Sequence, residues 1–130
     1  VILYGASIST SSRLGLGKEE NYAYDIYELE FVPEILYGSS YRKSLTTLFP
    51  RFLKTMAKYH DSDIRHYFKD AFGYEGSIEE SVGKMTGLFA ELGVDMYFDG
   101  EVSTEAIKGI DISTMLSADE VTGIVKECLR

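Results

Sequence analysis

The amino-acid sequence predicts an all-α fold, because helical periodicity of apolar residues recurs along the chain while the signals of β-strands are weak. Runs of β-branched residues are sparse, and no Asn-Gly or Asp-Gly pair separates two alternating segments. Of the 130 residues, 45% are hydrophobic and 26% are charged, which is typical of a chain that buries one core. We therefore expect a single multi-helix domain over residues 1–130, with roughly six to eight helices.

Three segments carry the clearest helical periodicity. Apolar residues three or four positions apart run through 45–59, 78–92 and 121–129. Each pattern is one apolar face of an amphipathic helix that packs on a core.

Capping signals agree with the second and third of these helices. Ser77 with Glu80, and Ser117 with Glu120, have the spacing of a capping box just before an apolar stripe. We expect Gly93 to end the helix that starts after Ser77.

The connection that follows Gly93 has the composition of a loop. Residues 94–102 are expected to form this loop, with an acidic turn inside it. Ser103 is then a plausible cap for a short helix over 104–109.

Pro50 interrupts the longest apolar stripe. It has no N–H to donate to Thr46, and its ring clashes with that carbonyl, so we expect a kinked helix at Pro50. Asp61 or Ser62 is expected to cap the helical segment that follows, and Gly73 to end it.

Composition narrows the classes of function and the compartment. The net charge of −8, from 21 acidic and 13 basic residues, disfavours nonspecific nucleic-acid binding. Cys128 is the single cysteine, so the chain has no disulfide framework and a reducing compartment such as the cytoplasm is favoured. Cys128 lies on an apolar stripe, which predicts a buried structural thiol. No apolar run approaches the ~20 residues of a membrane span, and we expect no membrane partner. The first residue is Val1 rather than Met, which suggests a fragment.

Two short patterns are candidates for ligand sites. The sequence GLGK at 15–18 lacks the Gly and the Ser or Thr that a phosphate-binding loop requires, so a helix stop explains it better. His60 and His66 are six positions apart, on opposite sides of a helix, so a solvated helix start is favoured over a weak metal site with Asp61 and Asp63.

Two charged pairs leave more than one interpretation open. Asp25 and Glu28 are either paired carboxylates on one helix face or an acidic first turn that the helix dipole favours, and the second interpretation is preferred. Arg42 and Lys43 follow the polar segment YGSSYRKS (37–44), where they could bind a phosphate or a carboxylate.

Several segments together resemble a known family. They are the apolar start VILYGASISTSSRLGLG, the pair Tyr22-Ala23, Tyr37 followed by the SSYR elbow, the step Phe49-Pro50, and the distal passage KMTGLFAELGVDMYF. With these features the chain resembles the C-terminal helical domain of iron-containing alcohol dehydrogenases of the butanol dehydrogenase type, which have the dehydroquinate synthase-like fold. The resemblance covers most of the chain.

The resemblance implies a partner domain and two cofactors. In that family an upstream nucleotide-binding domain binds NAD(P), and a divalent metal held by one Asp and three His lies between the two domains. The metal polarises an alcohol or aldehyde oxygen while NAD(P) exchanges a hydride.

This sequence departs from the family at two metal ligands. The first His position falls on Leu29 or Phe31, and the second falls on Tyr41, with Arg42 in place of a Gly. Leu and Phe cannot bind a metal, and a neutral phenol is a poor ligand. The resemblance therefore implies a degenerate metal site, with no metal, no cofactor and no catalytic residue in this chain.

Two hypotheses follow for the function. The chain is either the domain of a dehydrogenase homologue, in which Tyr37, Tyr41, Arg42 and Lys43 contact a substrate or an anion, or a non-catalytic helical binding or scaffolding module. In isolation, an apolar surface around residues 1–8 is expected to favour self-association.

Overall fold

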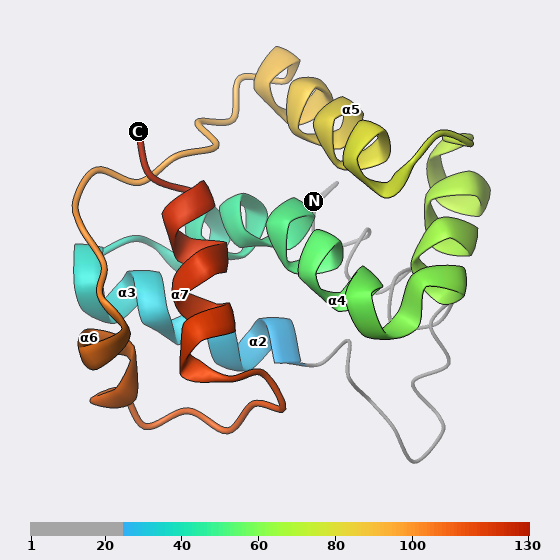
Figure 1. The fold of residues 1–130 in the computed structure, drawn as a ribbon. Coiled ribbons are helices and arrows are strands. Elements are labelled where there is room, and N and C mark those ends of the chain that lie inside the picture. Colours follow the sequence, from blue (N-terminus) through green and yellow to red (C-terminus); the bar gives the residue numbers. More distant parts are fainter. Residues whose placement is uncertain (1–24) are drawn as a thin grey trace.

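The computed structural model describes residues 25–130, and within this range it is built from helices with no β-sheet (Figure 1). The expected all-α class is confirmed for this part of the chain. The helices are α2 (Asp25–Leu29), α3 (Phe31–Tyr37), α4 (Tyr41–Phe72), α5 (Ile78–Glu91), α6 (Thr104–Lys108) and α7 (Ala118–Glu127).

Helix α4 is the centre of the fold. It packs against α2, α3, α5 and α7, while α6 packs on α7 (Figure 1). The apolar stripe predicted for 45–59 forms the core side of α4, where Leu48, Phe52, Leu53 and Met56 have no exposed surface. Burying side chains of this size contributes about 1.5–3 kcal/mol each, which makes α4 the main source of core stability.

The kink expected at Pro50 is wrong. The backbone of α4 keeps helical dihedral angles through Pro50, and the residue that leaves the helical region is His60, with φ −136° and ψ 48°. Pro50 is buried between Phe49, which is 1% exposed, and the core around Phe52. A proline inside a helix costs about 3 kcal/mol, and the burial of the surrounding side chains outweighs that cost.

The bend at His60 divides α4 into two halves with different directions (Figure 1). The bend lies one residue before Asp61, close to the position where the sequence predicts a new helical segment that begins at Asp61 or Ser62. Gly73 ends the second half as expected, with φ 72° and its N–H donated to the Lys69 carbonyl at 2.8 Å.

The predicted caps are confirmed. Ser77 Oγ accepts the N–H of Glu80, and Ser103 Oγ accepts the N–H of Ala106. Ser117 and Glu120 form a complete capping box. Gly93 follows the end of α5 with φ 86°.

The segment between α5 and α6 is an extended loop, as expected, and it is fixed by residues 128–130. Phe98 donates its N–H to the Cys128 carbonyl at 2.7 Å, and Arg130 donates its N–H to the Phe98 carbonyl at 3.2 Å. These bonds form an isolated parallel bridge between Phe98 and Leu129. The loop 95–101 therefore lies beside the C-terminal residues.

In residues 25–130, none of the helices combines the length and the apolar character that crossing a bilayer requires.

Candidate functional site

The segment 37–44 is an elbow between α3 and α4, as the sequence predicts. Gly38 adopts a left-handed conformation with φ 62° and ends α3, donating its N–H to the Glu34 carbonyl at 3.1 Å. Ser40 begins α4, because its Oγ accepts the N–H of Lys43 at 3.2 Å. The elbow is therefore a well-defined pair of helix caps.

Tyr37, the first of the predicted contact residues, is part of the fold rather than of a cleft. Its hydroxyl donates to the Glu101 carbonyl at 2.7 Å, and its ring stacks on Phe98 with 5.5 Å between the centroids. Burial raises the pKa of the hydroxyl, and the nearby Cys128 adds to that rise. Tyr37 thus attaches the elbow to the loop 95–101.

Lys43 also binds to this loop. Its Nζ lies 3.3 Å from the Asp95 carboxylate and 5.8 Å from the centroid of the Phe98 ring. Arg130 binds Asp95 as well, and it binds Asp99 at 2.8 Å. Although desolvation alone would raise the pKa of Asp95, the two neighbouring cations hold it below its ordinary value. The charge of Lys43 is therefore already matched by a carboxylate.

Two other predicted contact residues, Tyr41 and Arg42, lie at the surface of the first turn of α4. Tyr41 is 49% exposed, and Arg42 is also exposed. The structure thus separates the four predicted residues into two pairs. Tyr37 and Lys43 hold the loop, whereas the side chains of Tyr41 and Arg42 are exposed.

The two other positions that the resemblance aligns with a metal ligand differ sharply in environment. Leu29 is 1% exposed and belongs to the core, whereas Phe31 is 48% exposed at the start of α3. Within the part of the chain that the structure describes, no group of three or more His, Cys, Asp and Glu side chains is placed to hold a metal ion.

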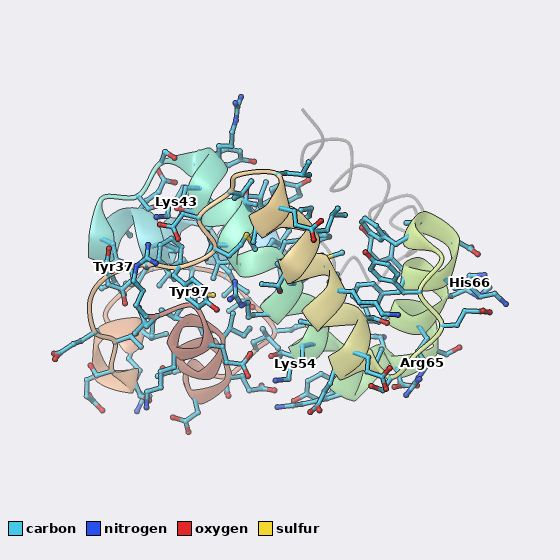
Figure 2. The ribbon with its side chains drawn as sticks, turned by 90° about the horizontal axis from the view of Figure 1, so that it is seen from above. Tyr37, Lys43, Lys54, Arg65, His66 and Tyr97 are labelled. Atoms are coloured by element: carbon cyan, nitrogen blue, oxygen red, sulfur yellow. The ribbon has the colours of Figure 1, made fainter. Side chains whose placement is uncertain are left out.

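The two histidines do not come together. His60 occupies the bend of α4, and the Nε2 of His66 lies 3.2 Å from Asp70 on the outer side of the second half of α4 (Figure 2). The two histidine side chains are apart, as their six-residue spacing predicts. His66 lies on a solvated helix surface.

Asp25 and Glu28 bind one distant segment. Asp25 accepts the hydroxyl of Thr114 at 2.8 Å and the N–H of Met115 at 3.0 Å, and Glu28 accepts the N–H of Ser113 at 2.9 Å. They do lie in the first turn of α2, as the preferred interpretation requires. Their observed role is to attach the segment before α7 to the start of α2.

Sequence reasoning missed a buried cation, Arg51. It is 6% exposed, and its Nη1 donates to the carbonyls of Thr47 and Met96 at 3.0 and 2.9 Å. Its guanidinium also lies 5.2 Å from the Tyr97 ring, which Arg130 approaches at 5.8 Å. An arginine inside the apolar stripe was the available signal, but one of its two acceptors, the Met96 carbonyl, lies in a loop 45 positions away.

Cys128 is the buried structural thiol that the sequence predicts. It has no exposed surface, and its Sγ lies 3.5 Å from the Thr47 carbonyl. Burial raises the pKa of the thiol to about 12, although the nearby Arg51 opposes this rise. A thiol held in this state is a poor nucleophile at neutral pH.

Glu30 is a second buried ionisable group that sequence reasoning missed. It is 1% exposed at the junction of α2 and α3, and its Oε1 has no hydrogen-bond partner among the residues that the structure describes. Burial, followed by the hydrogen bond and the charge of Glu34, raises the pKa of Glu30 to about 8. Glu30 therefore carries a proton at neutral pH.

Three sequence features lie outside the described residues. They are the apolar start at 1–8, the GLGK segment at 15–18 and the pair Tyr22-Ala23.

Comparison with known proteins gives no match: no protein-family model, curated protein or solved structure matches this chain. The resemblance to iron-containing alcohol dehydrogenases therefore stays a prediction from the sequence.

Proposed function

We propose that this chain is a non-catalytic helical binding module whose contact surface lies at α3 and the first turn of α4. One contrast carries the proposal. The polar elbow residues Tyr37 and Lys43 are held by the fold, whereas large side chains of α3 and of the first turn of α4 are exposed. Phe31, Ile35 and Tyr41 are 48%, 62% and 49% exposed.

Helix α3 has two distinct faces. Val32 and Pro33 are buried against the core, while Phe31 and Ile35 are one helical turn apart and share the outer face. Neighbouring large apolar side chains that remain exposed mark surfaces where proteins bind partners. We call Phe31, Ile35 and Tyr41 the α3 surface.

The chemistry of the α3 surface indicates the kind of partner. Arg42 follows Tyr41 directly and is exposed, and Arg and Tyr are enriched in the central contacts of protein interfaces. The partner that fits is a protein with an apolar groove and a carboxylate at its edge. Helix-in-groove recognition of this kind uses residues one turn apart, as Phe31 and Ile35 are.

A matched pair of variants tests this proposal. Phe31→Ser with Ile35→Ser removes the apolar side chains of the α3 surface, and Leu92→Ser with Met115→Ser removes two that are 53% and 59% exposed elsewhere. The partner would be identified by quantitative affinity capture and then purified and titrated by calorimetry. We expect the first variant to weaken binding by at least about tenfold, and the second to bind like the wild type.

Equal binding by both variants would exclude the α3 surface. Turnover of an alcohol with NAD(P) by the purified chain would contradict the non-catalytic assignment.

The sequence resemblance supports a second proposal, that the chain is the C-terminal domain of an alcohol dehydrogenase homologue with a degenerate metal site. Its partner would be the nucleotide-binding domain upstream, which binds NAD(P). Tyr41 and Arg42, both exposed, would then face that domain and hold an anionic group of a substrate.

Two measurements separate the second proposal from the first. An upstream coding sequence of roughly 200–250 residues with a Gly-rich phosphate loop would favour the dehydrogenase homologue. Elemental analysis of the purified protein is expected to find no stoichiometric iron or zinc, and one tightly bound ion per chain would rule out the degenerate site.

A further inference from the structure

A small pocket lies between the second half of α4 and the start of α5. Its volume is about 160 Å³, and it is lined by Arg65, Lys69, Tyr74, Glu75, Gly76 and Ser81. Figure 2 shows Arg65 near the opposite end of the molecule from Tyr37 and Lys43. The pocket is therefore separate from the elbow and from the α3 surface.

Two cations enter the pocket from α4. Arg65 and Lys69 are four positions apart, so their side chains lie on the same face of the helix. Arg65 uses its Nε to bind Asp61 at 2.7 Å, and no residue of the described range hydrogen-bonds to its two Nη groups. Lys69 lies 3.6 Å from the Glu75 carboxylate, beyond a normal hydrogen-bond length. Both cations can therefore donate to a ligand.

Ser81 contributes a hydroxyl from α5. The residue is 2% exposed and forms part of the pocket wall. A ligand oxygen in the pocket would accept this hydroxyl.

The side chains around the pocket carry both signs of charge, since Asp61 binds Arg65 and the Glu80 carboxylate lies against Gly76. Lys84 adds a third cation, 5.4 Å from the ring of Tyr74. Glu75 opposes them, but its side chain is 72% exposed and holds only one long contact. A dianion with several oxygen atoms could displace it, because its charge exceeds that of one carboxylate.

We propose that this pocket binds a phosphoryl group, either as inorganic phosphate or as a small phosphate monoester. The Nη groups of Arg65 form the planar fork that matches two phosphate oxygens, and Lys69 supplies a point charge. Ser81 donates its hydroxyl to the remaining oxygen, and the Tyr74 ring forms a wall for an attached organic group. This site goes beyond the binding module proposed above and does not depend on it.

Titration with inorganic phosphate at low ionic strength tests the proposal, with amide chemical shifts and calorimetry as the readouts. We expect saturable shifts at Gly76 and Ser81. Arg65→Gln with Lys69→Gln should weaken binding by at least about tenfold, and Ser81→Ala by a smaller factor. Lys108→Gln is the matched control, because this exposed lysine lies in α6, pairs with Glu105 and is not part of the pocket; it should bind like the wild type.

Phenyl phosphate distinguishes the two sources of the phosphoryl group. Tighter binding than inorganic phosphate would support a monoester whose ring packs on Tyr74, and equal binding would support phosphate itself. Shifts that do not saturate, or an equal loss in the Lys108→Gln control, would overturn the proposal, since either result describes nonspecific attraction. The charge variants alter exposed positions of α4, and circular dichroism would verify that they fold.

Discussion

Arg51 shows how one residue joins distant parts of the chain. Its guanidinium is inside the fold and donates to two carbonyls, one in its own helix and one in the loop 95–101. Removing this buried donor would leave the Met96 carbonyl without its partner, and this penalty exceeds the net contribution of an ordinary hydrogen bond. Arg51 therefore stabilises the loop against which Tyr37 and Lys43 also pack.

We expect Arg51→Met to lower the free energy of unfolding by about 1–3 kcal/mol, because the Met96 carbonyl loses its donor while the side-chain length is nearly kept. Urea denaturation measures the change. Lys108→Met, at an exposed position of α6, should stay within about 0.5 kcal/mol of the wild type. Equal effects of the two substitutions would show that Arg51 has no such role.

Glu30 predicts a pH dependence of stability. The pKa of its carboxyl rises from 4.5 to about 8 in the folded protein, so the folded state holds a proton that the unfolded chain releases between these values. The contribution of Glu30 to the free energy of unfolding should therefore be most favourable below about pH 4.5 and should fall as the pH rises to about 8. The slope can reach about 1.4 kcal/mol per pH unit.

Glu30→Gln should remove this slope, since an amide does not ionise. Urea denaturation at several pH values between 5 and 8 gives the comparison, and Glu79→Gln in the first turn of α5 is the control. A wild-type stability that stays constant over this range would contradict the raised pKa.

At the scale of elements, capping residues in the sequence predicted most of the helix ends, whereas the bend of α4 at His60 was not predicted. The signals at Ser77, Gly93, Ser103 and Ser117 are local in sequence, because a cap satisfies N–H or C=O groups within one turn. The effect of Pro50 depends instead on the packing around α4. Its cost is local, but the burial that outweighs it comes from other helices, which periodicity alone does not reveal.

Replacing glycine by alanine is expected to change the stability of the fold in opposite directions at two positions. Gly100 has φ 149°, and an added Cβ would lie 2.6 Å from the Tyr37 ring, so Gly100→Ala should destabilise the fold by about 1–3 kcal/mol. Gly83 lies within α5, where an added Cβ meets nothing within 4 Å. Gly83→Ala should stabilise by about 0.5–1 kcal/mol.

Thermal and urea denaturation of the two glycine variants check both signs. A stable Gly100→Ala protein would mean that Tyr37 is not held against the loop 95–101.

At the scale of the whole molecule, long-range contacts limited what the sequence could predict about the site. The contact between Lys43 and Asp95 spans 52 positions, and that between Asp25 and Thr114 spans 89. Residue types and local spacing correctly placed the elbow between two helices. They could not show that Tyr37 and Lys43 are held by the loop, because their partners come from another part of the chain.

Cys128 provides a probe of global opening. Its thiol is buried beside Thr47, 81 positions away, and its pKa is raised to about 12, so reaction requires the core to open. At pH 8 we expect a disulfide reagent to label the folded protein far more slowly than the protein in urea. Immediate labelling without urea would show that the end of α7 detaches from the core.

The bridge between Phe98 and residues 128–130 has a consequence for the protein during its synthesis. A nascent chain that has emerged only as far as α6 already contains α4, yet it lacks α7, Cys128 and the backbone partners of Phe98. The apolar side of α4 that α7 covers is then open to other proteins. Because domains fold as units, closure waits for residues 118–130 to leave the ribosome. Termination before Cys128 would release a chain that needs a chaperone rather than a shortened but folded domain.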